Sequence, residues 1–75
     1  MDFPQYRRYS NGSSYFKILD DRTFIEYQVV GNRVFEHRIT ARQYPEILRI
    51  KEMLGLELPG IEVADGEHVE SLQAR

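Results

Sequence analysis

The stretch "TFIEYQVVGNRVFEHRI", residues 23–39, decides the fold because it joins two runs of β-branched and aromatic residues through a "GN" pair. Such runs favour β-strands, and glycine and asparagine tolerate the positive φ angles that tight hairpins require. The stretch therefore predicts an antiparallel hairpin. Its first strand has apolar residues on both alternating faces, whereas a strand with one face in water needs them on one face only.

Two registers compete for this hairpin, and they differ by one residue in the loop. A two-residue "GN" loop sets Tyr27 opposite Glu36, which mixes apolar and charged residues on both faces. A loop of three residues, 31–33, sets Val29 opposite Phe35 and keeps the apolar residues together. We therefore expect the longer loop or a bulge at this turn.

Two further strands precede the hairpin, since "YRRYS" and "YFKIL" are separated from each other by "NGSS" and from the hairpin by "DD". These separators are turn residues, and strands joined so closely pair antiparallel. A two-residue "DD" turn sets Phe16 opposite Ile25 and Ile18 opposite Thr23. The sequence thus predicts a four-stranded antiparallel meander. Its expected strands are residues 6–10, 15–20, 22–30 and 33–39.

The segment "TARQYPEILRIKEMLG" that follows predicts one α-helix over residues 41–54, with the last glycine as its stop. Thr40 and Gln43 stand at capping-box spacing. Pro45 leaves two alternatives, because a proline too deep in a helix breaks its hydrogen bonds. Either the first turn is distorted, or the regular helix begins near Tyr44 with the proline in its first turn.

The expected helix has one apolar side, so it should cover one face of the sheet and give an α+β fold. The face expected beneath it, with Tyr9 added by the first turn, consists of Phe16, Ile18, Ile25, Tyr27, Val29, Phe35 and Ile39.

Residues 1–55 form the expected ββββα domain, and residues 56–75 form an acidic tail that we expect to be largely flexible. The body carries nine Lys and Arg against seven Asp and Glu, whereas the tail carries one against five. "EHVESLQ" is a candidate short helix, and the few apolar residues of the tail would dock on the body or on a partner. One hypothesis is that the acidic tail folds back over the basic body as a cover.

The sheet face without a helix is the candidate interaction surface, because it mixes aromatic, aliphatic and charged groups as association surfaces do. An alternative is that these are ordinary exposed apolar groups, shielded by the stems of long neighbours. We expect a small protein-interaction or accessory module that uses this face, or an exposed first or last strand, with a protein partner or as a homodimer. The candidate surface consists of Tyr6, Arg8, Tyr15, Lys17, Phe24, Val30, Val34 and Arg38.

Single-stranded nucleic acid is the alternative ligand for this face, because bases stack on aromatic rings while Arg and Lys hold phosphates. The platform would be Tyr6, Arg8, Tyr15, Lys17 and Phe24. Two acidic side chains, Glu26 and Glu36, fall on the same expected face, and the aromatic motif of RNA-binding sheets is absent. Protein is therefore the favoured partner.

Chemistry at a catalytic or cofactor site is not indicated by any residue pattern in the chain, so we expect no enzyme, no cofactor, no metal and no small-molecule substrate. The chain has no cysteine, and its two histidines, His37 and His68, belong to the hairpin and the tail. Asp20 and Asp21 form a carboxylate pair at a turn, where the turn role suffices.

No apolar run is long enough to span a bilayer, and we expect no membrane association and a cytoplasmic location.

Overall fold

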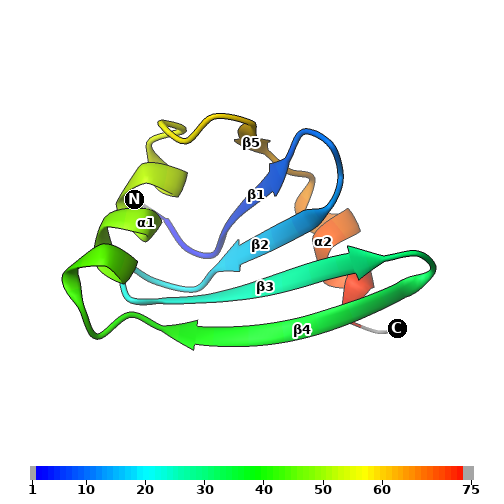
Figure 1. Cartoon of the computed structure of the whole chain (residues 1–75), viewed down its shortest axis with the longest axis horizontal. Coiled ribbons are helices and arrows are strands. Elements are labelled where there is room, and N and C mark those ends of the chain that lie inside the picture. The colour runs from blue at the N-terminus through cyan, green and yellow to red at the C-terminus, as the bar shows by residue number, and fades with distance from the viewer. Residues whose placement is uncertain (1, 74–75) are drawn as a thin grey trace.

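Residues 2–73, which the computed structural model describes, form five antiparallel strands and two helices (Figure 1). The α+β class and the antiparallel sheet predicted from the sequence are confirmed. Within this range no helix has the length and apolar character needed to cross a bilayer. The elements are β1 (Gln5–Tyr9), β2 (Ser14–Ile18), β3 (Thr23–Val30), β4 (Arg33–Thr40), α1 (Tyr44–Leu54), β5 (Ile61–Val63) and α2 (Gly66–Leu72).

The sheet order is β4-β3-β2-β1-β5, so the first four strands form the predicted meander and the fifth comes from the tail. The prediction of four strands and one helix was therefore incomplete. The tail predicted to be largely flexible supplies β5, and it supplies α2 where "EHVESLQ" was a candidate short helix. β5 pairs antiparallel with β1, with Ile61 opposite Tyr9. The tail is held because its apolar residues are buried: Ile61 is 9% exposed, Val69 0% and Leu72 4%.

The hairpin between β3 and β4 has the two-residue "GN" loop, with Val30 opposite Arg33. Gly31 takes a φ of 62°, the left-handed conformation in which a glycine is not strained. The predicted longer loop was wrong, and Tyr27 does lie opposite Glu36. The prediction assumed that one face of β3 is wet, whereas both faces are covered over part of their length.

The register between β2 and β3 is also shifted by one residue from the prediction, because the connection is longer than "DD" alone. Ile18 lies opposite Phe24, and Lys17 opposite Ile25. The backbone N–H of Leu19 donates to the Thr23 carbonyl at 2.9 Å, which closes the loop over residues 19–22. Phe24, and not Ile25, therefore shares a face with the core of β2.

Helix α1 covers that face at one end of the sheet (Figure 1). It begins at Tyr44 with Pro45 as its second residue, which confirms the later of the two predicted starts and shortens the predicted range of 41–54. The capping pair is also displaced from the prediction, since the Glu46 carboxylate accepts from the backbone N–H of Gln43 at 3.3 Å. The buried cluster beneath the helix consists of Phe16, Ile18, Phe24, Ala41, Ile50, Met53 and Ile61.

Helix α2 covers the opposite face, where it passes behind β2 and β3 in Figure 1. Val69 and Leu72 of this helix pack with Ile25 and Tyr27, which were predicted to lie beneath the other helix. The helix approaches β1 so closely that a Cβ atom at Gly66 would lie 2.8 Å from the ring of Tyr6. β3 has apolar residues on both faces, and each face is covered by its own helix.

A buried arginine on β1 joins the sheet to the end of α1. The Arg7 side chain is 6% exposed, and its Nε and Nη2 atoms donate to the carbonyls of Met53 and Leu54 at 3.0 and 3.1 Å. Nη1 donates to the Tyr6 carbonyl at 2.8 Å. Desolvation by burial lowers the pKa of the guanidinium from its ordinary value. The contact is favourable because a cation here meets the negative end of the helix dipole and donates to the last carbonyls of the helix, of which Met53 also accepts from the backbone N–H of Leu56.

Replacing Arg7 with methionine should lower the free energy of unfolding by about 2–3 kcal/mol. It leaves the Leu54 carbonyl without its donor and the Met53 carbonyl with only the backbone N–H of Leu56, while keeping an apolar stem. Arg8→Met is the matched control. Arg8 points to the other face and pairs with Glu62 at 3.3 Å with both side chains partly exposed, so its loss should cost about 1 kcal/mol or less. Urea unfolding of the two variants checks this, and equal losses would contradict the role given to Arg7.

The hydroxyl of Tyr27 is buried beneath α2 without a hydrogen-bond partner among the described residues. Burial, with the charges of Glu36 and Glu70 nearby, raises the pKa of this phenol. Tyr27→Phe removes the unpaired hydroxyl and keeps the ring, so we expect the free energy of unfolding to rise by about 1 kcal/mol. Thermal and urea unfolding would check this, and a loss of stability would mean that the hydroxyl has a partner in solution.

Candidate functional site

The eight residues predicted as one interaction surface lie on both faces of the sheet. Six of them are on the α2 face, because of the observed registers: Tyr6, Arg8, Tyr15, Lys17, Val34 and Arg38. The other two are on the α1 face. Phe24 is 1% exposed and belongs to the core, which corrects its prediction as a surface residue, whereas Val30 is 52% exposed near the hairpin tip.

The tail occupies much of the face that was predicted to be helix-free. The Tyr6 hydroxyl donates to the Glu70 carboxylate at 2.7 Å, and Lys17 Nζ lies 2.9 Å from the same carboxylate. The Tyr15 ring lies with its centroid 5.1 Å from that of His68. Acidic groups of the tail therefore meet basic and phenolic groups of the body, as the hypothesis of a tail folded back as a cover requires.

The contact between Glu70 and Tyr6 changes the pKa values of both groups. Hydrogen bonds from Lys17 and Tyr6 lower the pKa of the Glu70 carboxyl below its ordinary value of 4.5. Desolvation, and then the hydrogen bond to Glu70, raise the pKa of Tyr6 from 10.0 to about 12. The ionised carboxylate and the protonated phenol thus stabilise each other.

Glu70→Gln should lower the free energy of unfolding by about 0.5–1 kcal/mol at neutral pH, the size of a partly exposed ion pair. A lowered carboxyl pKa contributes stability that is present above the ordinary value of 4.5 and is lost as the pH falls through the lowered value. The difference between wild type and variant should therefore shrink on acidification. Urea unfolding at several pH values measures it.

The matched control is Glu67→Gln, which removes the same charge from an exposed position on α2. On the alkaline side, the stability contributed by Tyr6 is present below its ordinary pKa of 10.0 and is lost as the pH rises towards about 12. Tyr6→Phe should remove that alkaline dependence. Equal acid dependence in the Glu70 and Glu67 variants would contradict the assignment.

The longest uncovered part of the sheet is the outer side of β4. β4 is an edge strand of eight residues, and Figure 1 shows no element beyond it at the lower margin of the molecule. The backbone N–H of Val29 donates to the Ser13 carbonyl at 2.9 Å. The backbone groups of the odd-numbered residues of β3 therefore form hydrogen bonds with β2, and those of the even-numbered residues with β4. The odd-numbered residues of β4 lie opposite the even-numbered residues of β3, so their backbone groups form hydrogen bonds with β3. The "β4 edge" is the row of outward-facing backbone groups of Val34, Glu36, Arg38 and Thr40.

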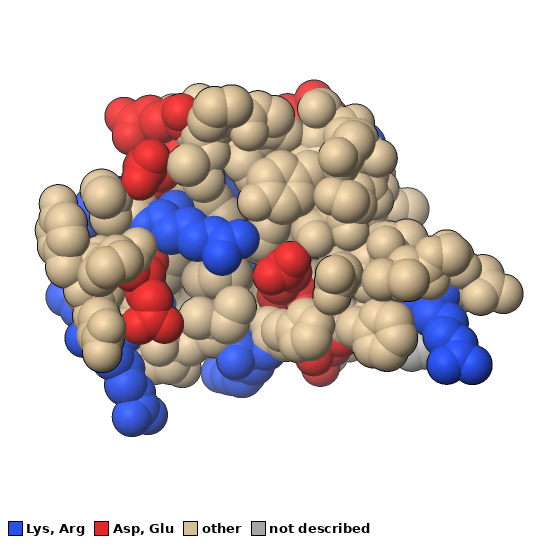
Figure 2. Space-filling view, viewed as in Figure 1, with Lys and Arg blue, Asp and Glu red and all other residues tan. Residues whose placement is uncertain are grey.

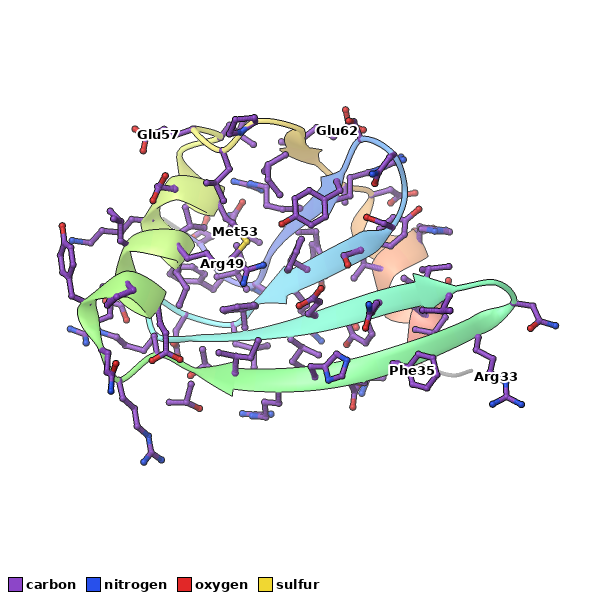
Figure 3. The ribbon with its side chains drawn as sticks, in the orientation of Figure 1. Arg33, Phe35, Arg49, Met53, Glu57 and Glu62 are labelled. Carbon is purple, nitrogen blue, oxygen red and sulfur yellow. The ribbon has the colours of Figure 1, made fainter. Side chains whose placement is uncertain are left out.

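Exposed apolar side chains lie beside the β4 edge on the α1 face. Phe35 is 44% exposed, and Val30 next to the turn is 52% exposed. Figure 3 shows Phe35 and Arg33 near the hairpin tip, well away from Arg49 and Met53 of α1. Helix α1 therefore leaves this half of its face open.

Polar groups fill the middle of the same open face. Ser14 Oγ donates to the Glu26 carboxylate at 2.8 Å, and His37 Nε2 lies 3.4 Å from Gln28 Oε1. Figure 2 shows separated acidic and basic groups on this side, with uncharged atoms between them. The surface beside β4 is thus mixed in character, with charges of both signs.

The chain finds no counterpart among protein-family models, curated proteins or solved structures. Within residues 2–73 no pocket opens, and no three His, Cys, Asp or Glu side chains gather into a metal-binding group. The candidate site is therefore argued from the geometry of the sheet alone.

Of the two edges predicted as open, only one is. The first strand was a candidate edge, but β5 pairs with it. The last strand is open, yet the predicted surface included only Val34 and Arg38 from it. Glu36 was placed on the same face but left out of that surface, and Phe35 was predicted to lie beneath the helix, whereas it is 44% exposed. The signal was present in the "GN" pair, because a two-residue loop places every side chain of β4.

Proposed function

We propose that this chain is a small non-catalytic protein-interaction module that binds an extended segment of a protein along the β4 edge. The observation that carries the proposal is the eight-residue edge strand with unpaired outward backbone groups and exposed Phe35 beside them. A cytoplasmic location stays part of the proposal, as does the absence of catalysis.

Strand addition fits this edge for two reasons. The outward N–H and C=O groups offer main-chain hydrogen bonds to any extended segment, and the side chains that alternate along the strand offer selectivity. The other edge of the sheet, β5, has three residues and offers a much shorter row. A partner strand therefore gains most at β4.

Several contacts favour a protein partner over single-stranded nucleic acid. Two members of the basic and aromatic platform, Tyr6 and Lys17, are engaged by Glu70, and Arg8 is paired with Glu62. Phe24 is buried. A phosphate backbone approaching this face would meet the carboxylates of the tail, and such contacts oppose the binding of polyanions.

The test is selection of peptide ligands from a random displayed library against the folded protein, followed by mapping of each ligand by amide hydrogen exchange. Ligands should protect the amides of Val34, Glu36 and Arg38, which face outward. Glu36→Pro removes one outward N–H without touching the ladder to β3, so it should weaken binding by about tenfold or more.

Glu36→Thr is the matched control, because it removes the same charge but keeps the N–H and suits a strand. It should retain peptide binding, and circular dichroism should show both variants folded. Ligands that map to another surface, or equal binding by the proline and threonine variants, would contradict the proposal.

A further inference from the structure

We infer that the segment bound at the β4 edge is β4 of a second copy of this chain, paired antiparallel about a two-fold axis that passes beside His37. The inference rests on the proposed function, since it names the partner of the same edge. It is argued from the charge pattern of β4, from the apolar groups beside it and from the space around the strand.

Charge complementarity selects the register. With His37 opposite its own copy, Glu36 lies opposite Arg38 of the second copy, and by symmetry Arg38 lies opposite Glu36. Both side chains are exposed and point to the α2 face. Opposite charges directly across a strand pair stabilise it, and here the symmetry makes the contact twice.

The neighbouring two-fold registers are penalised by the same rule. If the axis passes beside Glu36, this carboxylate faces its own copy and Arg38 faces Val34. If it passes beside Arg38, the guanidinium faces its own copy and Glu36 faces Thr40. Like charges directly opposite are destabilising, so only the register centred on His37 pairs every charged outward residue with its opposite.

The same register also pairs the apolar side chains on the α1 face. Phe35, which is 44% exposed, lies opposite Ile39 of the second copy, and this contact too occurs twice. Ile39 already packs against the buried cluster beneath α1. The apolar layer of one copy would therefore continue across the boundary into the layer of the other, with Phe35 covered.

The backbone and the surroundings of β4 permit this pairing. The outward residues meet in hydrogen-bonding pairs, Glu36 with Arg38 and Val34 with Thr40, which supply about eight main-chain bonds after symmetry. Helix α2 packs on β1 and β2, and α1 contacts β1, so neither helix lies along the outer side of β4 (Figure 1). The pair is closed by its symmetry, because a two-fold contact uses the same edge of both copies. A chain of 75 residues gains stability from such a partner.

The experiment is a charge swap across the axis, read as solution mass against concentration by analytical ultracentrifugation of the full chain. Wild type should show a concentration-dependent dimer. Glu36→Arg and Arg38→Glu each place like charges opposite one another twice, so each should raise the dimer dissociation constant by about tenfold or more. The double variant E36R/R38E should restore the wild-type value.

Mixing the two single variants gives the sharpest readout. A heterodimer of Glu36→Arg with Arg38→Glu restores both opposite pairs, so it should form where neither variant alone dimerises. Glu57→Arg is the control, because it makes the same charge change at an exposed position far from β4 (Figure 3). It should dimerise as wild type does. Circular dichroism should show all variants folded, since the altered side chains are exposed.

A wild-type chain that stays monomeric at the highest attainable concentration would overturn the inference. So would single variants that dimerise as wild type does, or a mixture that forms no heterodimer. Failure of this inference is distinguishable from failure of the proposed function. A monomer that still binds selected peptides at the β4 edge loses only the self-pairing, whereas a monomer that binds none there loses both.

Discussion

The two-residue turn at Gly31 and Asn32 is the constraint on which the open edge depends. With Gly31 at a φ of 62°, the turn sets Val30 opposite Arg33 and so fixes which side chains of β4 face α1. It also fixes which backbone groups point away from the sheet. A loop longer by one residue would move Phe35 to the other face and turn the backbone groups of Glu36 inward. The charge pattern of the edge follows from this single turn.

Much of the architecture is predictable from the sequence because its signals are local. The four-stranded meander, the main helix and its later start at Tyr44 all rest on short runs and on turn or capping residues. The tail was harder, since β5 has only three residues, too few for a clear strand pattern, and the candidate helix that became α2 has only Val69 and Leu72 as apolar anchors. Both registers were wrong by one residue, for different reasons. In the β3–β4 hairpin apolar residues were paired to fit one wet face, whereas between β2 and β3 the connection is longer than the two-residue turn that was assumed.

The candidate site shows the same division between local and global information. Arg7 and Arg8 are adjacent and chemically alike, yet one is buried at the end of α1 and the other is paired at the surface. Their difference depends on the face on which each side chain falls, which no local pattern reveals. In the same way, Phe24 was predicted to be an exposed aromatic residue, whereas the observed register places it beneath α1. The open last strand was predictable, but which of its residues are accessible was not.

The place of α2 in the chain has a consequence for the order in which the protein is made. Most of the cluster on the α1 face comes from residues up to Met53, with Ile61 added later, whereas Ile25 and Tyr27 wait for Val69 and Leu72. At about 5–20 residues per second, the stretch from residue 54 to residue 72 takes roughly one to four seconds to synthesise. During that interval the α1 side of the sheet has most of its cluster, whereas the apolar residues of the other side have no cover. The acidic charges of the late segment also keep it hydrated until it reaches the basic groups that it finally covers.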